Sequence, residues 1–321
     1  MLLKLVLRLL GDPIRYESTL SDAVGHDPTI ESLDDLQNNG SYQALRRYLA
    51  SETDSASRQL CIEVVARDTP RHEIITRWAQ EHPDDPNAHV VAGLQAVRLA
   101  WRARSGARAN DVRKDQWQGF AEYLYLAEEI LEHALQLAPD EPMTHASLVV
   151  VDCGMGRSTD VAMGRMAKIR KVDPTHFYGY TNLLSMCCDK WCGSHEQMFQ
   201  LARSPNLAKP GRENLGVLIP MAHLERTLFE SVGASNAHWR QPEVATEIAD
   251  SFDRGIGRPG FHGDALTPVA AGTFAGVFHR LKDRDRCHRA HQLVQGFYHD
   301  RSWFLLGSER GFKASRKWCG A

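Results

Sequence analysis

Residues 134–142 read ALQLAPDEP, and residues 166–174 read MAKIRKVDP. A third version of this pattern, WAQEHPDDP, occupies residues 78–86. Each stretch is a helix-forming segment followed by a short polar turn that contains proline. A proline is tolerated in the first turn of a helix because its missing N–H has no intrahelical partner there. The three stretches therefore predict helix–turn–helix units that follow one another along the chain.

The spacing of these turns predicts a repeat. Pro139 and Pro174 are 35 residues apart, close to the tetratricopeptide period of about 34 residues. Pro83 precedes Pro139 by 56 residues, which fits one unit with an insertion at residues 105–116. Stacked helical pairs bury their apolar faces on their neighbours. We therefore expect an all-α fold, a degenerate tetratricopeptide-like α-solenoid of stacked helical hairpins.

Proline pairs mark the expected helix starts. A polar residue stands directly before proline at Asp85-Pro86, Glu141-Pro142, Asp173-Pro174 and Thr267-Pro268. Behind such starts, apolar residues recur every three or four positions, as in Val90, Leu94, Val97 and Trp101, which is typical of one apolar helix face. A last hairpin is predicted from residues 271–281 and 286–295.

Two segments do not follow the helical pattern. Residues 11–57 are rich in Asp, Ser and Asn, so we expect residues 1–57 to form an irregular N-terminal cap or extension. Residues 58–321 then form one continuous helical-repeat domain. Residues 255–264 hold four glycines and a proline, which predicts a surface loop between helices that can lie over a binding groove.

Composition excludes several classes of protein. The 321 residues include 38 Lys and Arg against 40 Asp and Glu, so a formal net charge of -2 disfavours nucleic acid and anionic lipid as partners. No stretch approaches the roughly 18 apolar residues of a membrane span, and residues 1–10 do not resemble a signal peptide. Seven cysteines, an odd number, favour reduced thiols. We expect a cytoplasmic protein that contacts no membrane.

The densest group of reactive side chains lies at residues 187–199, CCDKWCGSHEQMF. Ser194 and Gln197 fit a capping box, so they need no functional explanation. The candidate catalytic residues are His195 and Glu196, as an acid–base pair, and Lys190, as an anchor for an anionic group. The opposing interpretation is a solvated turn between helices with one packed tryptophan, Trp191.

A metal site is the alternative chemistry for the same segment. Cys188, Cys192 and His195 are spaced so that one turn of chain could bring them near an ion. No second pair of ligands completes a tetrahedral set in the sequence. Buried thiols are therefore favoured over a metal, and we expect no cofactor.

Histidines recur at equivalent places in the repeats. His89, His145 and His176 each follow a turn proline by two or three residues, where packing between units is favoured over ligand binding. His223 lies on a helix expected from residue 213 to residue 229. His288 and His291 stand beside several arginines and are predicted to mark an exposed face. The candidate ligand-binding residues are Trp191, His176, Tyr180, His223 and His145.

The residues 190–199 element, KWCGSHEQMF, together with residues 81–88, 100–104, 134–142 and 173–176, resembles a group of uncharacterised bacterial tetratricopeptide-like proteins. The resemblance covers about residues 60–310, and its most specific part is the Lys-Trp-x-Gly-Ser-His-Glu element. It implies a helical-repeat fold and a cytosolic bacterial setting. It implies no reaction, because no activity is assigned to that group.

Two classes of function follow from these patterns. The first is a binding protein whose concave groove holds a peptide, a protein segment or a small molecule. The second is an enzyme in the same groove that uses His195, Glu196 and Lys190, with Trp191 as an apolar wall. The absence of a complete catalytic pattern favours the binding protein. Neither the ligand nor the oligomeric state follows from the sequence.

Overall fold

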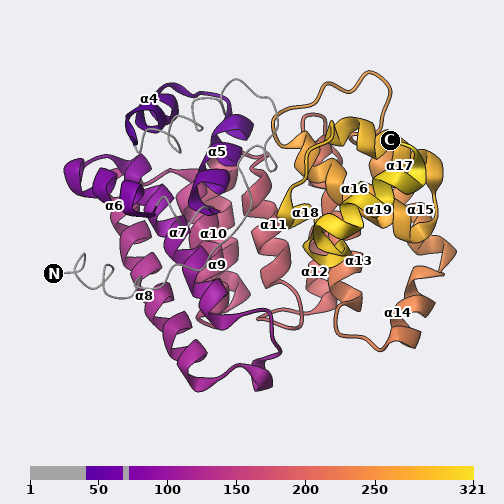
Figure 1. Ribbon diagram of the computed structural model, residues 1–321, viewed down its shortest axis with the longest axis horizontal. Helices are drawn as coiled ribbons and strands as arrows, with labels where there is room; N and C mark the ends of the chain where they lie inside the picture. The colour runs from indigo at the N-terminus through magenta and orange to yellow at the C-terminus, as the bar shows by residue number, and fades with distance from the viewer. Residues whose placement is uncertain (1–40, 68–71) are drawn as a thin grey trace.

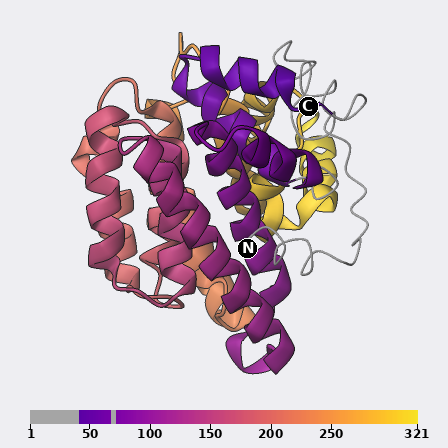
Figure 2. The ribbon, with the colours of Figure 1, turned by 90° about the vertical axis from the view of Figure 1, so that its left-hand side faces the viewer.

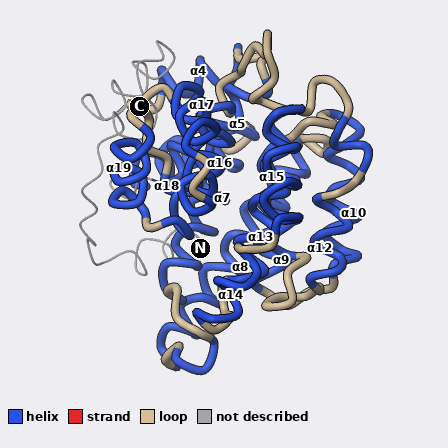
Figure 3. The backbone as a smooth tube through the Cα atoms, turned by 90° about the vertical axis from the view of Figure 1, so that its right-hand side faces the viewer, coloured by secondary structure: helices blue, strands red, loops and turns tan. Residues whose placement is uncertain are grey.

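The computed structural model describes residues 41–67 and 72–321. In these two ranges the chain forms sixteen α-helices and four short 3-10 helices and contains no strand, which confirms the all-α class (Figure 1, Figure 3). None of the helices described is both long enough and apolar enough to cross a membrane. The helices are α4 (Gln43–Ser51), α5 (Ser55–Arg67), α6 (His72–Glu81), α7 (Pro86–Arg104), η2 (Ala109–Asp111), α8 (Lys114–Leu137), α9 (Pro142–Gly154), α10 (Thr159–Val172), α11 (Phe177–Met186), α12 (His195–Ala202), η3 (Pro205–Ala208), η4 (Glu213–Val217), α13 (Leu218–Thr227), α14 (Val232–Trp239), α15 (Pro242–Arg254), α16 (Thr267–Leu281), α17 (Arg284–Val294), α18 (Asp300–Trp303), η5 (Phe304–Leu306) and α19 (Ser308–Cys319).

The two longest helices, α7 and α8, pack as a hairpin whose tip extends beyond its neighbours (Figure 2). Gly93 permits this close approach, because a Cβ atom there would lie 2.5 Å from the buried side chain of Leu131. Helices α9 and α10 form a second pair. The predicted last hairpin is confirmed as α16 and α17, which Lys282 joins in a left-handed conformation with φ 64°.

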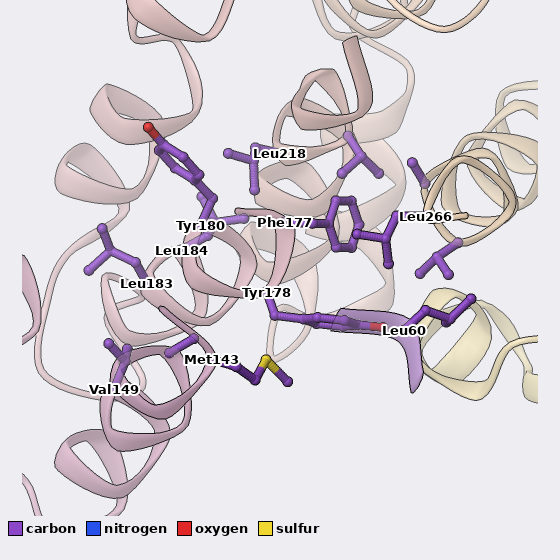
Figure 4. Packing of buried hydrophobic residues seen from close by; sticks show 14 of the residues in the cluster. Leu60, Met143, Val149, Phe177, Tyr178, Tyr180, Leu183, Leu184, Leu218 and Leu266 are labelled. Atoms are coloured by element: carbon purple, nitrogen blue, oxygen red, sulfur yellow. The ribbon is translucent and has the colours of Figure 1, made fainter. Parts of the chain in front are cut away.

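One continuous core joins the N-terminal helices α4–α11 to the C-terminal helices α12–α19. Helix α11 lies at the centre of this core (Figure 1). The ring of Phe177 lies near Leu266, and the ring of Tyr178 runs toward Leu60 of α5 (Figure 4). Arg301 of α18 adds a polar link, because its guanidinium donates to Asn182 of α11 at 2.5 Å and lies 5.0 Å from the centre of the Tyr178 ring.

Three of the four predicted helix starts are confirmed, and the fourth is displaced. Pro86 and Pro142 are the first residues of α7 and α9, and Pro268 lies in the first turn of α16. Helix α11 instead begins at Phe177, three residues after Pro174. The Asp173 carboxylate accepts from the Thr175 N–H at 2.9 Å and from its hydroxyl at 2.7 Å, which holds residues 173–175 as a turn.

The expected irregular cap is only partly irregular. Residues 43–51 form helix α4, and the boundary expected at residue 57 falls inside α5. Tyr42 stacks on Trp78 with 5.9 Å between the ring centres, and Arg46 pairs with Asp85 at 3.0 Å, so tertiary contacts hold this polar segment as a helix. The rest of the expected cap, residues 1–40, lies outside the described residues.

The single helix expected from residue 213 to residue 229 is two elements, η4 and α13. Pro220 has no N–H to donate to the carbonyl of Gly216, so a continuous α-helix cannot form there. The Ser251 hydroxyl donates to that carbonyl instead, at 2.7 Å. The glycine-rich segment at residues 255–264 connects α15 and α16 without helix, as predicted.

Candidate functional site

The connection between α11 and α12 holds the predicted cluster in a tight turn. A Cβ atom at Gly193 would lie 2.3 Å from the Cys187 carbonyl oxygen, so only glycine fits there. The Ser194 hydroxyl accepts from the Gln197 N–H at 3.2 Å and caps α12, as the sequence predicted. The polar side chains of this turn are therefore set in place by backbone packing.

Lys190, the predicted anion anchor, already has an anionic partner. Its ammonium group donates to the carboxylate of Glu225 on α13, and both side chains are largely buried. The pair joins the connection between α11 and α12 to helix α13, and its two residues are 35 positions apart in the sequence. An ammonium group neutralised in this way is less able to hold an anionic substrate.

The predicted acid–base pair is not brought together. His195 Nε2 lies 3.1 Å from the Asp189 carboxylate, while Glu196 is exposed and faces no described partner. The second ring nitrogen of His195, Nδ1, is buried and has no hydrogen-bond partner in the described part of the chain. The carboxylate that orients the imidazole is thus Asp189, six residues earlier in the chain.

The predicted metal ligands also lie apart. Cys188 Sγ points into the core, where it donates to the Leu184 carbonyl at 3.4 Å and lies 3.3 Å from Met198 Sδ. Burial raises the pKa of its thiol, as it does for Cys192. Among the described residues, the only group of three metal-ligating side chains with donor atoms within 4.8 Å of one another lies elsewhere, on α17 and α19.

Three of the candidate ligand-binding residues are buried at helix junctions. His145 Nε2 donates to the Pro139 carbonyl at 2.9 Å, and His89 repeats this contact with Pro83 at 2.7 Å. His176 caps α11, because its Nδ1 accepts from the Gly179 N–H at 3.0 Å. The hydroxyl of buried Tyr180 accepts from Arg170. These contacts fit the packing role that the repeat pattern favours.

His223 is the buried member of a series of polar contacts that runs to the surface. Its Nε2 donates to the Glu247 carboxylate at 3.1 Å, and its Nδ1 accepts from His238 at 2.9 Å. Arg203 holds the same carboxylate through two nitrogens at 2.7 Å and 2.9 Å. Burial lowers the pKa of His223 to about 4, although Glu247 opposes the shift. The contacts among His223, His238 and Glu247 link helices α13, α14 and α15.

The surface histidine pair expected on α17 is also different in the structure. His288 is partly exposed, but His291 is buried. Its ring stacks on Trp303 with 5.9 Å between the ring centres. The neighbouring Arg286 and Arg289 pair with Asp253 of α15, while the Cys287–His291 side of the helix packs on α19, which the charge pattern of α17 did not reveal.

Trp191, the last sequence candidate, belongs to an aromatic cluster around Arg104. The guanidinium carbon of Arg104 lies 5.3 Å from the ring centres of Trp191 and Trp117 and 5.9 Å from that of Trp101. Distances below about 6 Å permit cation–π attraction. Sequence reasoning placed Trp101 on an apolar helix face and missed Arg104, although both stand in the quoted segment at residues 100–104.

Arg104 is nearly buried, with 7% of its surface exposed. One of its terminal nitrogens, Nη1, donates to the carbonyls of Ser105 and Ala107 at 3.1 and 3.2 Å, and its Nε is buried without a partner. Burial lowers the pKa of the guanidinium. Within the described ranges, no carboxylate pairs with Arg104, so this cation lacks a counter-ion there.

The surface beside this cluster is apolar and basic. Trp117 is 38% exposed and Phe229, in the connection between α13 and α14, is 53% exposed. Arg108 lies in the connection between α7 and α8. Its guanidinium carbon is 5.6 Å from the centre of the Phe229 ring, so this residue links the α7–α8 connection to the α13–α14 connection. The α7–α8 tip and α14 lie at the same end of the molecule (Figure 1). We call Arg104, Arg108, Trp117, Trp191 and Phe229 the tryptophan–arginine surface.

The tryptophan–arginine surface combines aromatic rings with basic side chains. It offers aromatic faces and two guanidinium groups, which suit planar or anionic groups, but no oriented nucleophile. Comparison with models of known protein families, with curated proteins and with solved structures finds no match to this chain.

Proposed function

We propose that this chain is a tetratricopeptide-like helical-repeat protein that binds a peptide or protein segment at the tryptophan–arginine surface. The single observation behind the proposal is Arg104, a nearly buried cation packed against three tryptophan rings without a carboxylate partner in the described residues. All seven cysteines are unpaired, which supports a cytoplasmic location as part of the same proposal.

The state of Arg104 favours an acidic ligand. Removing a cation from water costs several kcal/mol, and cation–π contacts of about 0.5–2 kcal/mol each offset only part of that cost. A carboxylate that reached the guanidinium would supply charge-assisted hydrogen bonds that the protein itself does not provide. An acidic side chain of the ligand is therefore the expected contact.

The exposed apolar residues favour a peptide over a small molecule. Phe229 and Leu228 are exposed next to Arg108, and Trp117 is exposed above Arg104. Leu228 and Phe229 come from the connection between α13 and α14, and Trp117 comes from the first turn of α8, so an extended segment would contact more of these residues than a compact molecule. The expected ligand is a peptide in which an aspartate or glutamate stands near an aromatic or leucine residue.

The second class from the sequence, an enzyme, has less support. Glu225 neutralises Lys190, and Glu196 is exposed and does not contact His195. Asp189 beside His195 is the one observation in favour, because a carboxylate orients a catalytic imidazole in many enzymes. The buried and unpartnered Nδ1 of His195 has no access to a substrate in this arrangement.

A peptide array tests the proposal. The array displays short peptides with one acidic and one aromatic or leucine residue, and each has a partner peptide with the amide in place of the acid. We expect acidic peptides to bind the unmodified protein and to bind Arg104→Ala about 10–100-fold more weakly, from the value of a hydrogen bond to a charged group. Phe229→Ala should also weaken binding.

The matched control is Arg254→Ala, which removes an exposed guanidinium on α15 that pairs with Asp250. It should leave binding unchanged, and far-ultraviolet circular dichroism should show that all variants are folded. Equal binding by Arg104→Ala and by the unmodified protein, or equal binding of acidic and amide peptides, would refute the proposal. His195→Ala, which should bind normally, separates the proposal from the enzyme alternative.

A further inference from the structure

Three side chains with donor atoms for a soft metal meet inside the C-terminal helices. Cys287 and His291 lie four residues apart on α17, and Cys319 lies at the end of α19. All three are buried, and one ligand atom of each lies within 4.8 Å of the other two. This cluster takes no part in the tryptophan–arginine surface.

The two helices hold the cluster as two adjacent pairs. Cys287 faces Cys319, and His291 faces Ser315, four residues before Cys319. Four residues forward along α17, from Cys287 to His291, correspond to four residues back along α19, from Cys319 to Ser315. This is the pattern expected for antiparallel helices in which residues four apart share a face. The donors therefore come from helical positions and not from a loop.

The histidine of the cluster has one engaged and one open nitrogen. Nε2 lies 2.6 Å from the Ser315 hydroxyl, whereas Nδ1 is buried and has no hydrogen-bond partner in the described residues. The residue is 4% exposed, and Trp303 and Phe312 pack on its ring. A buried polar atom without a partner is costly, and it needs an explanation in any native structure.

We propose that Cys287, His291 and Cys319 bind a zinc ion, with Ser315 as the positioning residue that orients the imidazole. Two thiolates and one imidazole are a donor set that zinc prefers. The Ser315 contact resembles the hydrogen bond that usually fixes a metal-bound histidine ring, and it leaves Nδ1 for the ion.

The geometry requires only a small movement. In a tetrahedral site with Zn–S bonds of about 2.3 Å, two sulfur atoms lie about 3.8 Å apart. The donor atoms are at most 4.8 Å apart without an ion, so side-chain rotation can close the difference. As each Zn–S bond forms, its thiol releases one proton to solvent, and one position of the tetrahedron remains for a further ligand.

Metal analysis of the full chain, purified without chelator under reducing conditions, tests the proposal first. We expect about one zinc per chain. Cobalt chloride added to chelator-treated protein should then produce the intense thiolate-to-cobalt charge-transfer band in the near ultraviolet, and Zn²⁺ should abolish it. Cys287→Ser and Cys319→Ser should each lose most of this band, and His291→Ala should weaken cobalt binding.

Two further variants separate metal binding from a structural role. Cys61→Ser changes a buried cysteine outside the cluster, so it should keep both the zinc and the cobalt band. Ser315→Ala should keep the band but weaken metal binding about 10–100-fold. The proposal is overturned if the unmodified, reduced protein contains no metal and shows no cobalt band, which does not depend on whether any variant folds. A Cys287–Cys319 disulfide in place of the ion would overturn it as well.

Discussion

Acid should destabilise this protein in part through two buried histidines, His176 and His223, and replacing both should remove their share of the effect. Burial lowers the pKa of His176 and of His223 to about 4, from an ordinary value of 6.5. Between these pH values the unfolded chain binds protons that the folded chain does not. The free energy of unfolding therefore falls as the pH decreases through this window, and it is fully restored above it.

The size of the effect follows from the two pKa values. One histidine with these values reduces the free energy of unfolding by about 2 kcal/mol between about pH 7 and about pH 5, so the pair contributes about 4 kcal/mol. The charged neighbours do not prevent this loss, because Asp173 beside His176 and Glu247 beside His223 oppose the shift but burial outweighs them.

The variant His176→Asn, His223→Gln removes both titrations and keeps hydrogen-bonding groups. Asparagine is a strong N-cap residue and can still accept from the Gly179 N–H. Urea denaturation, followed by far-ultraviolet circular dichroism from about pH 7 to about pH 5, should show a loss smaller by about 4 kcal/mol than in the unmodified protein.

The test compares how much the free energy of unfolding changes with pH in each protein, so a lower stability of the variant at neutral pH does not affect the result. His262→Gln, at an exposed histidine, is the matched control and should follow the curve of the unmodified protein. If the double variant loses as much stability as the unmodified chain, then burial does not hold these two histidines neutral, and the argument fails.

Three more stability predictions follow from the packing and from the buried ion pairs. Gly93→Ala should lower the free energy of unfolding by about 1–3 kcal/mol, because the new methyl group would collide with Leu131 between α7 and α8. Gly164→Ala, in the middle of α10 with open space around it, should instead raise it by about 0.5–1 kcal/mol; the same sign for both in urea denaturation would contradict the packing argument. Asp152→Asn should cost about 3 kcal/mol, because this buried carboxylate accepts from both Arg157 and Arg165; thermal unfolding unchanged from that of the unmodified protein would show that the two ion pairs add nothing.

Local features of the fold were predictable because their causes lie within a few residues. Pro86 and Pro142 open helices, and Ser194 caps α12 through an N–H three residues away. Such contacts depend on short-range backbone geometry alone. The displaced start of α11 is the exception that shows the limit, since Asp173 also accepts from the hydroxyl of Ser55, which is 118 residues earlier in the chain.

The candidate site was predicted only in part. The segment at residues 187–199 does carry Trp191 and Lys190 at a junction of several helices, but the partners of these residues are distant in sequence. Glu225 pairs with Lys190 across 35 residues, and Trp191 packs on Trp101 of α7. A pattern in one segment cannot show which carboxylate or ring another segment will supply.

The sequence by itself determined the all-α class, three of the helix starts and the last helical hairpin, because helical periodicity, proline and capping act locally. Only the tertiary structure decided that His223 is buried, that Arg104 packs against three tryptophan rings, and that Cys287, His291 and Cys319 meet. The physical reason is that burial, charge pairing and metal geometry depend on distances in space, and packing between helices sets those distances.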